Sequence, residues 1–180
     1  DTVAGNGSIG SATSVGIGYS DAPYIAYYNY SDPKLMYATQ NPSWSSSIID
    51  DSYADVGKYP SLAFDRVTRC GNLAYLDFTN GWLMFAKQTP NYTGHCGPDD
   101  TNWGGSRVEY ISQGGFGISL AIDPNNKPVI SFVDGEDHLV KVARYIVSGG
   151  SCDDNGWNCY SIAPGHPTEW GETSIWADDP

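Results

Sequence analysis

Short runs in which apolar and polar residues alternate follow one another along the chain, with turn-forming residues between them. Typical runs are Ser61-Leu-Ala-Phe-Asp and, a few residues later, Asn72-Leu-Ala-Tyr-Leu-Asp. A period of two residues over a run this short predicts a β-strand with one face in a core, and close turn signals favour antiparallel pairing. No run approaches the roughly 18 apolar residues that a membrane-spanning helix needs, so we expect no membrane insertion.

These runs recur as an internal repeat. In each of three units a Ser-led first run is followed by a second and a third alternating run and then by a tryptophan, which is Trp44, Trp103 or Trp157. The small residue of the second run precedes the alanine of the third run by 12 positions in every unit. Constant spacing is typical of a repeated supersecondary unit, because insertions are tolerated only at exposed turns. The Ser-led runs are Ser14-Val-Gly-Ile-Gly, Ser61-Leu-Ala-Phe-Asp, Ser119-Leu-Ala-Ile-Asp and, near the end, Ser174-Ile-Trp-Ala-Asp.

The repeat predicts an all-β fold, a β-propeller or an arc of one, built from four-stranded antiparallel blades. We expect one domain over residues 1–180, with a single strand at each end of the blades. An immunoglobulin-type sandwich is the alternative, but it would not repeat three times within one chain. Closed propellers usually have about four to eight blades, so we expect a part of a longer array or chains that associate into a ring or a filament. The expected blades cover residues 12–50, 59–112 and 117–163, and the single strands cover residues 2–4 and 173–178.

The repeat resembles that of secreted bacterial and archaeal β-propeller proteins. Its pattern is Ser-Leu-Ala-x-Asp, Pro-x-Ile-Ser-Tyr-x-Asp, Leu-x-x-Ala and often Cys…Trp-x-Cys. The third unit matches best, with Ser119-Leu-Ala-Ile-Asp, Pro128-Val-Ile-Ser-Phe-Val-Asp and Cys152…Trp157-Asn-Cys159. The resemblance covers nearly the whole chain. It implies a propeller and a secreted or cell-surface location, and it implies no particular ligand, since such repeats occur in lectins, adhesins and enzyme-attached modules alike.

The four cysteines form an even set without a Cys-x-x-Cys pair, which gives a zinc site little support and favours disulfides in an oxidising compartment. Cys152 and Cys159 would cross-link strands three and four of the third unit. Cys70 and Cys96 lie in two loops that emerge at the same end of the second unit, so we expect them to form the second bond. Three glycosylation sequons begin at Asn6, Asn29 and Asn91.

Charge narrows the choice of partners. The chain has 9 Lys and Arg against 21 Asp and Glu, a net charge of −12 that disfavours nucleic acid and anionic membranes. This acidity either keeps an exposed protein soluble or, in the Asp-rich loops, binds Ca²⁺. The loops do not match the spaced Asp-x-Asp-x-Asp-Gly calcium pattern, so we expect no cofactor and no metal and keep Ca²⁺ as the alternative.

Candidate ligand-binding residues lie where the second strands end. Asn29, Asp77 and Asp134 occupy equivalent positions there, and either they cap turns or they converge on a sugar hydroxyl or a cation. Trp82, which follows Asp77, breaks the repeat and is the fourth candidate. The recurring tryptophans favour core packing over ligand contact.

No nucleophile motif and no sialidase-type Asp box occurs in the chain, so we expect no enzyme. The function that the sequence favours is a secreted binding or adhesion propeller that recognises carbohydrate or another cell-surface ligand. The first alternative is a structural subunit of an extracellular assembly or filament, completed by strand pairing between chains. The second is a fragment of a glycan-active enzyme, since two of the many carboxylates could converge.

Overall fold

The computed structural model describes residues 9–18, 21–52, 55–90, 94, 96–97 and 101–164. These residues form twelve β-strands in three four-stranded antiparallel sheets, which confirms the all-β expectation. Within each sheet the strands follow chain order, because each strand pairs with the next one along the chain. No helix among the described residues is long and apolar enough to cross a membrane.

The three sheets span residues 9–50, 56–110 and 116–164, close to the three expected units. The single strands expected at residues 2–4 and 173–178 lie outside the described residues. The strands of the first sheet are β1 (Ile9–Ile17), β2 (Pro23–Asn29), β3 (Lys34–Gln40) and β4 (Trp44–Asp50). Those of the second are β5 (Val56–Phe64), β6 (Gly71–Asp77), β7 (Trp82–Gln88) and β8 (Trp103–Tyr110). Those of the third are β9 (Phe116–Ile122), β10 (Pro128–Val133), β11 (Leu139–Tyr145) and β12 (Trp157–Pro164).

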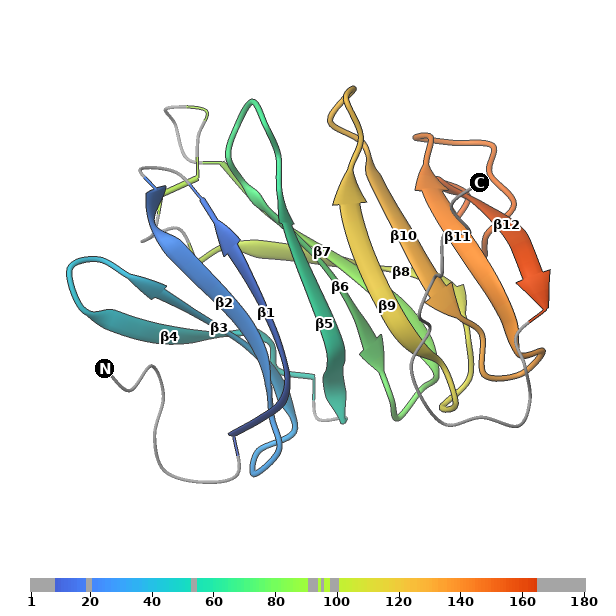
Figure 1. The fold of residues 1–180 in the computed structure, drawn as a ribbon, viewed down its shortest axis with the longest axis horizontal. Helices are drawn as coiled ribbons and strands as arrows, with labels where there is room; N and C mark the ends of the chain where they lie inside the picture. Colours follow the sequence, from blue (N-terminus) through green and yellow to red (C-terminus); the bar gives the residue numbers. More distant parts are fainter. Residues whose placement is uncertain are drawn as a thin grey trace, which may run out of the picture.

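The sheets stand side by side in an open row (Figure 1). Their first strands are neighbours, since β5 contacts β1 and β9 contacts β5. Each sheet therefore has a forward face, turned toward the next sheet along the chain, and a backward face, turned toward the preceding one. The second sheet is covered on both faces, and for this reason all seven residues of β6 are buried.

Two apolar cores fill the spaces between the sheets. They form because successive side chains of a strand point to opposite faces, so that alternate residues reach opposite neighbours. The first core joins the forward face of the first sheet (Tyr24, Ala26, Leu35, Tyr37) to the backward face of the second (Leu62, Leu73, Tyr75, Ala86). The second core joins the forward face of the second sheet (Ala74, Leu76, Leu83, Phe85) to the backward face of the third (Leu120, Ile130, Phe132, Trp157).

The recurring tryptophans belong to these cores. The ring of Trp103 lies 5.8 Å from that of Tyr37, and the ring of Trp157 lies 5.1 Å from that of Phe85. Each of the two thus packs from a backward face onto the aromatic residue of the third strand in the preceding sheet. For both, the contact agrees with the core interpretation of the sequence.

Both expected cysteine pairs are bonded: Cys70 with Cys96, and Cys152 with Cys159. The second bond differs in detail from the expectation. Cys152 lies in the loop after β11, which ends at Tyr145, so the bond ties this loop to β12 and does not join β11 to β12. The loop is long enough to fold back, and the Cys152 N–H donates to the carbonyl oxygen of Trp157 at 3.1 Å.

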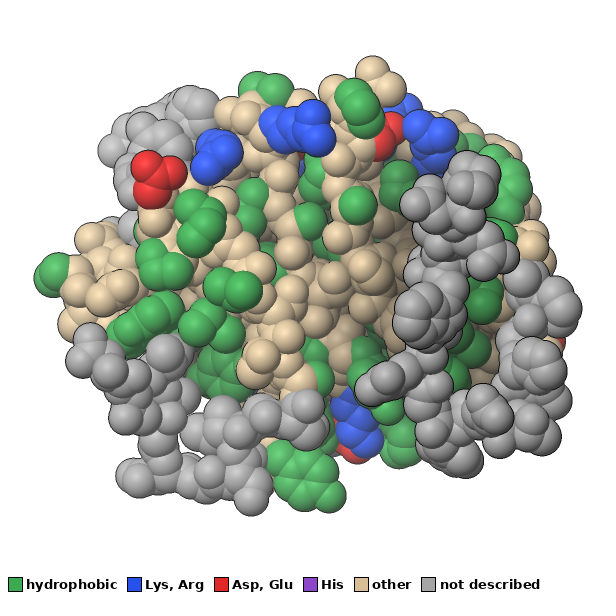
Figure 2. Space-filling model, viewed as in Figure 1, with side chains coloured by type: hydrophobic (Ala, Val, Ile, Leu, Met, Phe, Trp, Pro, Cys, Tyr) green, Lys and Arg blue, Asp and Glu red, His purple; other side chains and the backbone are tan. Residues whose placement is uncertain are grey.

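Apolar side chains also lie on the outside of the row. Figure 2 shows hydrophobic residues gathered over the first sheet, at the left of the view. Val15 and Ile17 of β1 are 68% and 51% exposed. They belong to the backward face of the first sheet, against which no sheet of the described residues packs.

Candidate functional site

The three residues that end the second strands each hold their own turn. The Oδ1 of Asn29 accepts backbone N–H bonds from Ser31 at 3.1 Å and from Asp32 at 3.3 Å. The carboxylate of Asp77 accepts both the backbone and the side-chain N–H of Asn80, at 3.1 and 2.8 Å. These contacts are those of the turn-capping interpretation, which the sequence left open.

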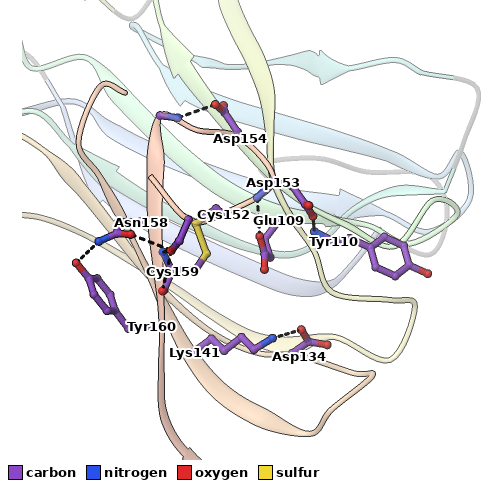
Figure 3. The surroundings of a disulfide bond; sticks show 12 residues. Glu109, Tyr110, Asp134, Lys141, Cys152, Asp153, Asp154, Asn158, Cys159 and Tyr160 are labelled. Carbon is purple, nitrogen blue, oxygen red and sulfur yellow. Dashed lines mark hydrogen bonds and ion pairs between the residues drawn. A yellow bond between two sulfur atoms is a disulfide. The ribbon is translucent and has the colours of Figure 1, made fainter. Parts of the chain in front are cut away.

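Asp134, the third of these residues, is also bonded to neighbouring groups. Its Oδ1 accepts the Glu136 N–H at 2.8 Å, and its Oδ2 lies 2.7 Å from the Nζ of Lys141 (Figure 3). The same ammonium contacts Asp137 at 2.8 Å. Burial lowers the pKa of Lys141, but the bonds to the two carboxylates outweigh it, so its pKa lies above the usual range. Asn29, Asp77 and Asp134 thus bond within the turns of three separate sheets, and only Asp77 lines a groove.

Trp82 and Asp77 do lie together, because they are partners in the register of β6 and β7. The ring of Trp82 is half-buried and already has two contacts. The guanidinium of Arg107 lies 4.9 Å from its centroid, and the ring of Tyr110 lies 5.5 Å away at a steep angle. Trp82 therefore packs against Arg107, and only part of its ring face remains open to a ligand.

A groove lies beside this pair, between the end of β4 and the backward face of the second sheet. Its volume is about 390 Å³. Gly105 of β8 lies in its wall, and because this residue has no side chain the space beside the Tyr75 hydroxyl stays unfilled. The polar and aromatic residues that line it include Asp50, Asp51, Tyr75, Asp77, Asn80, Trp103 and Arg107.

The carboxylate of Asp50 is fixed within the groove. One oxygen accepts the hydroxyl of Tyr75 at 2.9 Å and the other accepts the backbone N–H of Ser52 at 3.0 Å. Burial, followed by the charge of Asp50, raises the pKa of Tyr75 far above its usual range, so this hydroxyl remains a donor. The Nε1–H of Trp103 is buried and has no acceptor among the described residues, although Trp103 lines the groove.

The groove is acidic overall. Asp50, Asp51 and Asp77 line it against one cation, Arg107. Of the four candidates from the sequence, Asp77 lines the groove, Trp82 supports Arg107 from outside the lining, and Asn29 and Asp134 lie elsewhere.

Three further groove residues were not predicted from the sequence: Tyr75, Asn80 and Arg107. Tyr75 follows the alternating pattern of a core strand, and its hydroxyl was the only available signal. Asn80 reads as an ordinary turn residue. Arg107 is one of only nine cations in the chain and stands in a strand, which was a usable signal.

A second groove of the same volume, about 390 Å³, separates the second sheet from the third. Gly104, Lys87, Lys127, Tyr145 and Asp154 are among its lining residues. Gly105 lines both grooves, whereas Gly104 lines only this one. A change at Gly104 therefore alters the second groove and leaves the lining of the first unchanged.

The disulfide Cys152–Cys159 lies beside Glu109, and the three side chains form a group with metal-ligand atoms within 4.8 Å of one another (Figure 3). The two sulfurs are bonded to each other, so they cannot serve as thiolate ligands. Glu109 instead accepts the Asp153 N–H at 2.8 Å, and the Tyr110 N–H donates to the carboxylate of Asp153 at 2.8 Å. Burial raises the pKa of Glu109, and the charges of Asp153 and Asp134 add to the increase.

Of the three sequons, the one at Asn29 begins on the last residue of β2, whose side-chain oxygen is hydrogen-bonded and which is half-buried. Asn6 and Asn91 lie outside the described residues. Glycosylation at the three sites stays a prediction.

Comparison with known proteins leaves the groove to be interpreted from its own chemistry. No protein-family model matches the chain, and no curated protein matches it either.

Proposed function

We propose that this protein is a secreted, non-enzymatic binding protein, built as an arc of a β-propeller, whose groove between the first and second sheets takes a neutral carbohydrate. The observation that carries the proposal is the convergence in one groove of fixed carboxylates, an amide, a guanidinium and aromatic rings. Sugar hydroxyls are bound by such planar polar groups, and the apolar faces of sugars pack against aromatic rings.

The charge of the groove favours a neutral ligand over an anionic one. Three carboxylates face a single guanidinium, so an anionic glycan would meet net repulsion, whereas a neutral sugar needs only the hydrogen-bonding groups. The carboxylates of Asp50 and Asp77 are held in place by neighbouring donors before any ligand arrives. Groups that are ordered beforehand lower the entropy cost of binding.

The propeller assignment is supported by the repeat and by the arrangement of the sheets. Three sheets of the same topology pack face to face in chain order, with their first strands adjacent. The proposal that the chain is similar to secreted propeller proteins is supported by the same repeat, which carries the Cys…Trp-x-Cys element in the third unit. Two disulfides support secretion, because such bonds persist mainly in oxidising compartments.

The proposal is tested with a pair of neighbouring variants. A Cβ on Gly105 would lie 3.6 Å from the Tyr75 hydroxyl, an ordinary contact distance, so Gly105→Val adds a side chain beside this wall of the groove. A Cβ on Gly104 meets nothing within 4 Å, and that residue does not line this groove. We expect the wild-type protein to bind neutral glycans on an array, Gly105→Val to bind at least about tenfold more weakly, and Gly104→Val to bind as the wild type does.

Two outcomes contradict the proposal. One is a wild-type protein that is silent on the array, or that selects anionic glycans. The other is equal binding by the two glycine variants, which would place the ligand elsewhere. The non-enzymatic assignment has its own check, because turnover of chromogenic glycosides that is abolished by Asp50→Asn or Asp77→Asn would show a glycan-active enzyme.

A further inference from the structure

One hydrogen bond recurs between the sheets. The side-chain oxygen of Ser14 accepts the backbone N–H of Leu62 at 2.9 Å, and that of Ser61 accepts the backbone N–H of Leu120 at 2.9 Å. In both cases the serine is the first residue of the repeat, and the donor is the residue after the equivalent serine of the next sheet. Ser119 is the third serine of this series, and it is exposed on β9.

The aromatic contact recurs in the same direction. Trp103 packs against Tyr37 and Trp157 packs against Phe85, and each contact lies on the forward face of the preceding sheet. In the third sheet the equivalent position holds Val142, which is only half-buried. A forward face thus makes two recurring contacts with the following sheet. One is made by a serine oxygen on its first strand, and the other by an apolar side chain on its third strand.

Apolar side chains are exposed at both ends of the row, although Tyr27 and Ala38 of the first sheet's backward face are buried. Leu62 and Leu120 are 8% and 7% exposed, whereas Val15, which holds the equivalent position on the first sheet, is 68% exposed. On the forward face of the third sheet, Tyr160 and Ile162 of β12 are 52% and 65% exposed. These two end faces correspond to the two sides of a sheet interface that the chain already forms twice.

We infer that the forward face of the third sheet is an interface for a second copy of this chain and that it receives the backward face of that copy's first sheet. In this interface Ser119 accepts the backbone N–H of Val15, and Val142 packs against Trp44, as their equivalents do within the chain. Two copies contribute six sheets, which lies within the range of about four to eight that closed propellers have, while three copies would exceed it. The rotation closes after two copies, and the assembly is a ring with two identical interfaces.

A second copy fits this face better than a single strand of the same chain does. The forward face extends over β10, β11 and β12 through Val133, Val142 and Tyr160. A single added strand pairs with one neighbouring strand and does not span the three strands of this face. A four-stranded sheet is needed to cover the rest, and among the described residues the first sheet offers the uncovered backward face.

The association is tested on the full chain by size exclusion with light scattering, with circular dichroism to check the fold of each variant. We expect a discrete species at twice the chain mass of 19.5 kDa. Val15→Arg and Val142→Arg each place a charge in the interface and shift the chain to a folded species at the single mass. Val67→Arg is the matched control, since Val67 is 65% exposed in the turn between β5 and β6, on neither end face, and this variant stays at twice the mass.

Mixing the two single-mass variants tests the direction of the contact. The Val15→Arg chain keeps an intact forward face and the Val142→Arg chain keeps an intact backward face, so the mixture regains pairs through one interface. A wild-type chain that is monomeric at all concentrations overturns the inference, as do open-ended polymers or a dimer that neither Arg variant disrupts. Failure of the glycan experiment leaves this inference standing, since the groove lies between the first and second sheets of one chain.

Discussion

The side-chain oxygen of Ser61 accepts the backbone N–H of Leu120 at 2.9 Å, a bond that ties the first strand of the second sheet to the first strand of the third. Leu62 likewise donates its backbone N–H to Ser14, so the residues after the second and third repeat serines each bond to the preceding sheet. This contact links the regular spacing of the sequence directly to the packing of the sheets.

Ser61→Ala removes that acceptor and leaves a partly buried N–H without a partner. We expect the free energy of unfolding to fall by about 1–2 kcal/mol. Ser119→Ala is the equivalent change in the third sheet, which no further sheet of the described residues follows, and it changes the free energy of unfolding by less than about 0.5 kcal/mol. Both are measured by urea denaturation in the Val142→Arg background, which keeps chains apart. Equal losses for the two variants would show that the serine matters for its own strand and not for the next sheet.

Trp157 is 1% exposed and packs against the rings of Phe85 and Tyr145. Trp157→Ala removes a large buried side chain between two sheets, so we expect a loss of about 3–5 kcal/mol in the same background. Trp44→Ala removes the equivalent residue of the first sheet, which is only half-buried, and we expect a loss of about 1–2 kcal/mol. The comparison uses denaturant midpoints, and a larger loss for Trp44 would contradict the packing described for the two tryptophans.

The two disulfides close loops of different length. Cys70 and Cys96 are 26 residues apart in sequence, and Cys152 and Cys159 are 7 apart. On the chain-entropy model, replacing the first pair by alanine costs about 3–4 kcal/mol and replacing the second costs about 2 kcal/mol. Denaturation of the two double variants measures this order. Mass spectrometry of a non-reduced digest checks the pairing, and a peptide that links Cys70 to Cys152 would refute it.

Glu109 is the acid whose ionisation opposes folding. Burial first, and then the charges of Asp153 and Asp134, raise its pKa in the folded state above the unfolded value. The folded chain then binds the proton more tightly, so the contribution of Glu109 to stability is favourable below its unfolded pKa and is lost as pH rises through its folded pKa. At neutral pH the ionised side chain is a net cost.

Glu109→Gln removes this cost and keeps an oxygen that can accept the Asp153 N–H. We expect the variant to be more stable than the wild type at pH 7, with the difference shrinking toward zero as pH falls below the pKa of Glu109. Thermal unfolding of both proteins across this pH range is the measurement. Glu136→Gln, at an exposed turn position, is the control for loss of one negative charge. A difference that grows toward low pH would refute the assignment.

Part of the candidate site followed from the sequence. Trp82 was singled out because it breaks the repeat, and the structure does place it beside Asp77. Of the two interpretations of Asn29, Asp77 and Asp134, the contacts are those of turn capping, since each side chain accepts a backbone N–H of the turn that it closes. Arg107 and Tyr75 line the groove because the end of β4 and the second sheet are separated there. No local sequence pattern indicates that separation.

By itself, the sequence determined the strands, their pairing within each sheet and the two disulfides. These features depend on alternation with a period of two, on short connections and on loops that emerge at the same end, all of which are local along the chain. Only the tertiary structure decided which face of each sheet meets its neighbour, where a groove remains and which apolar faces stay uncovered. Those features depend on the distance and angle between sheets, which are set by the fit of side chains that are far apart in sequence.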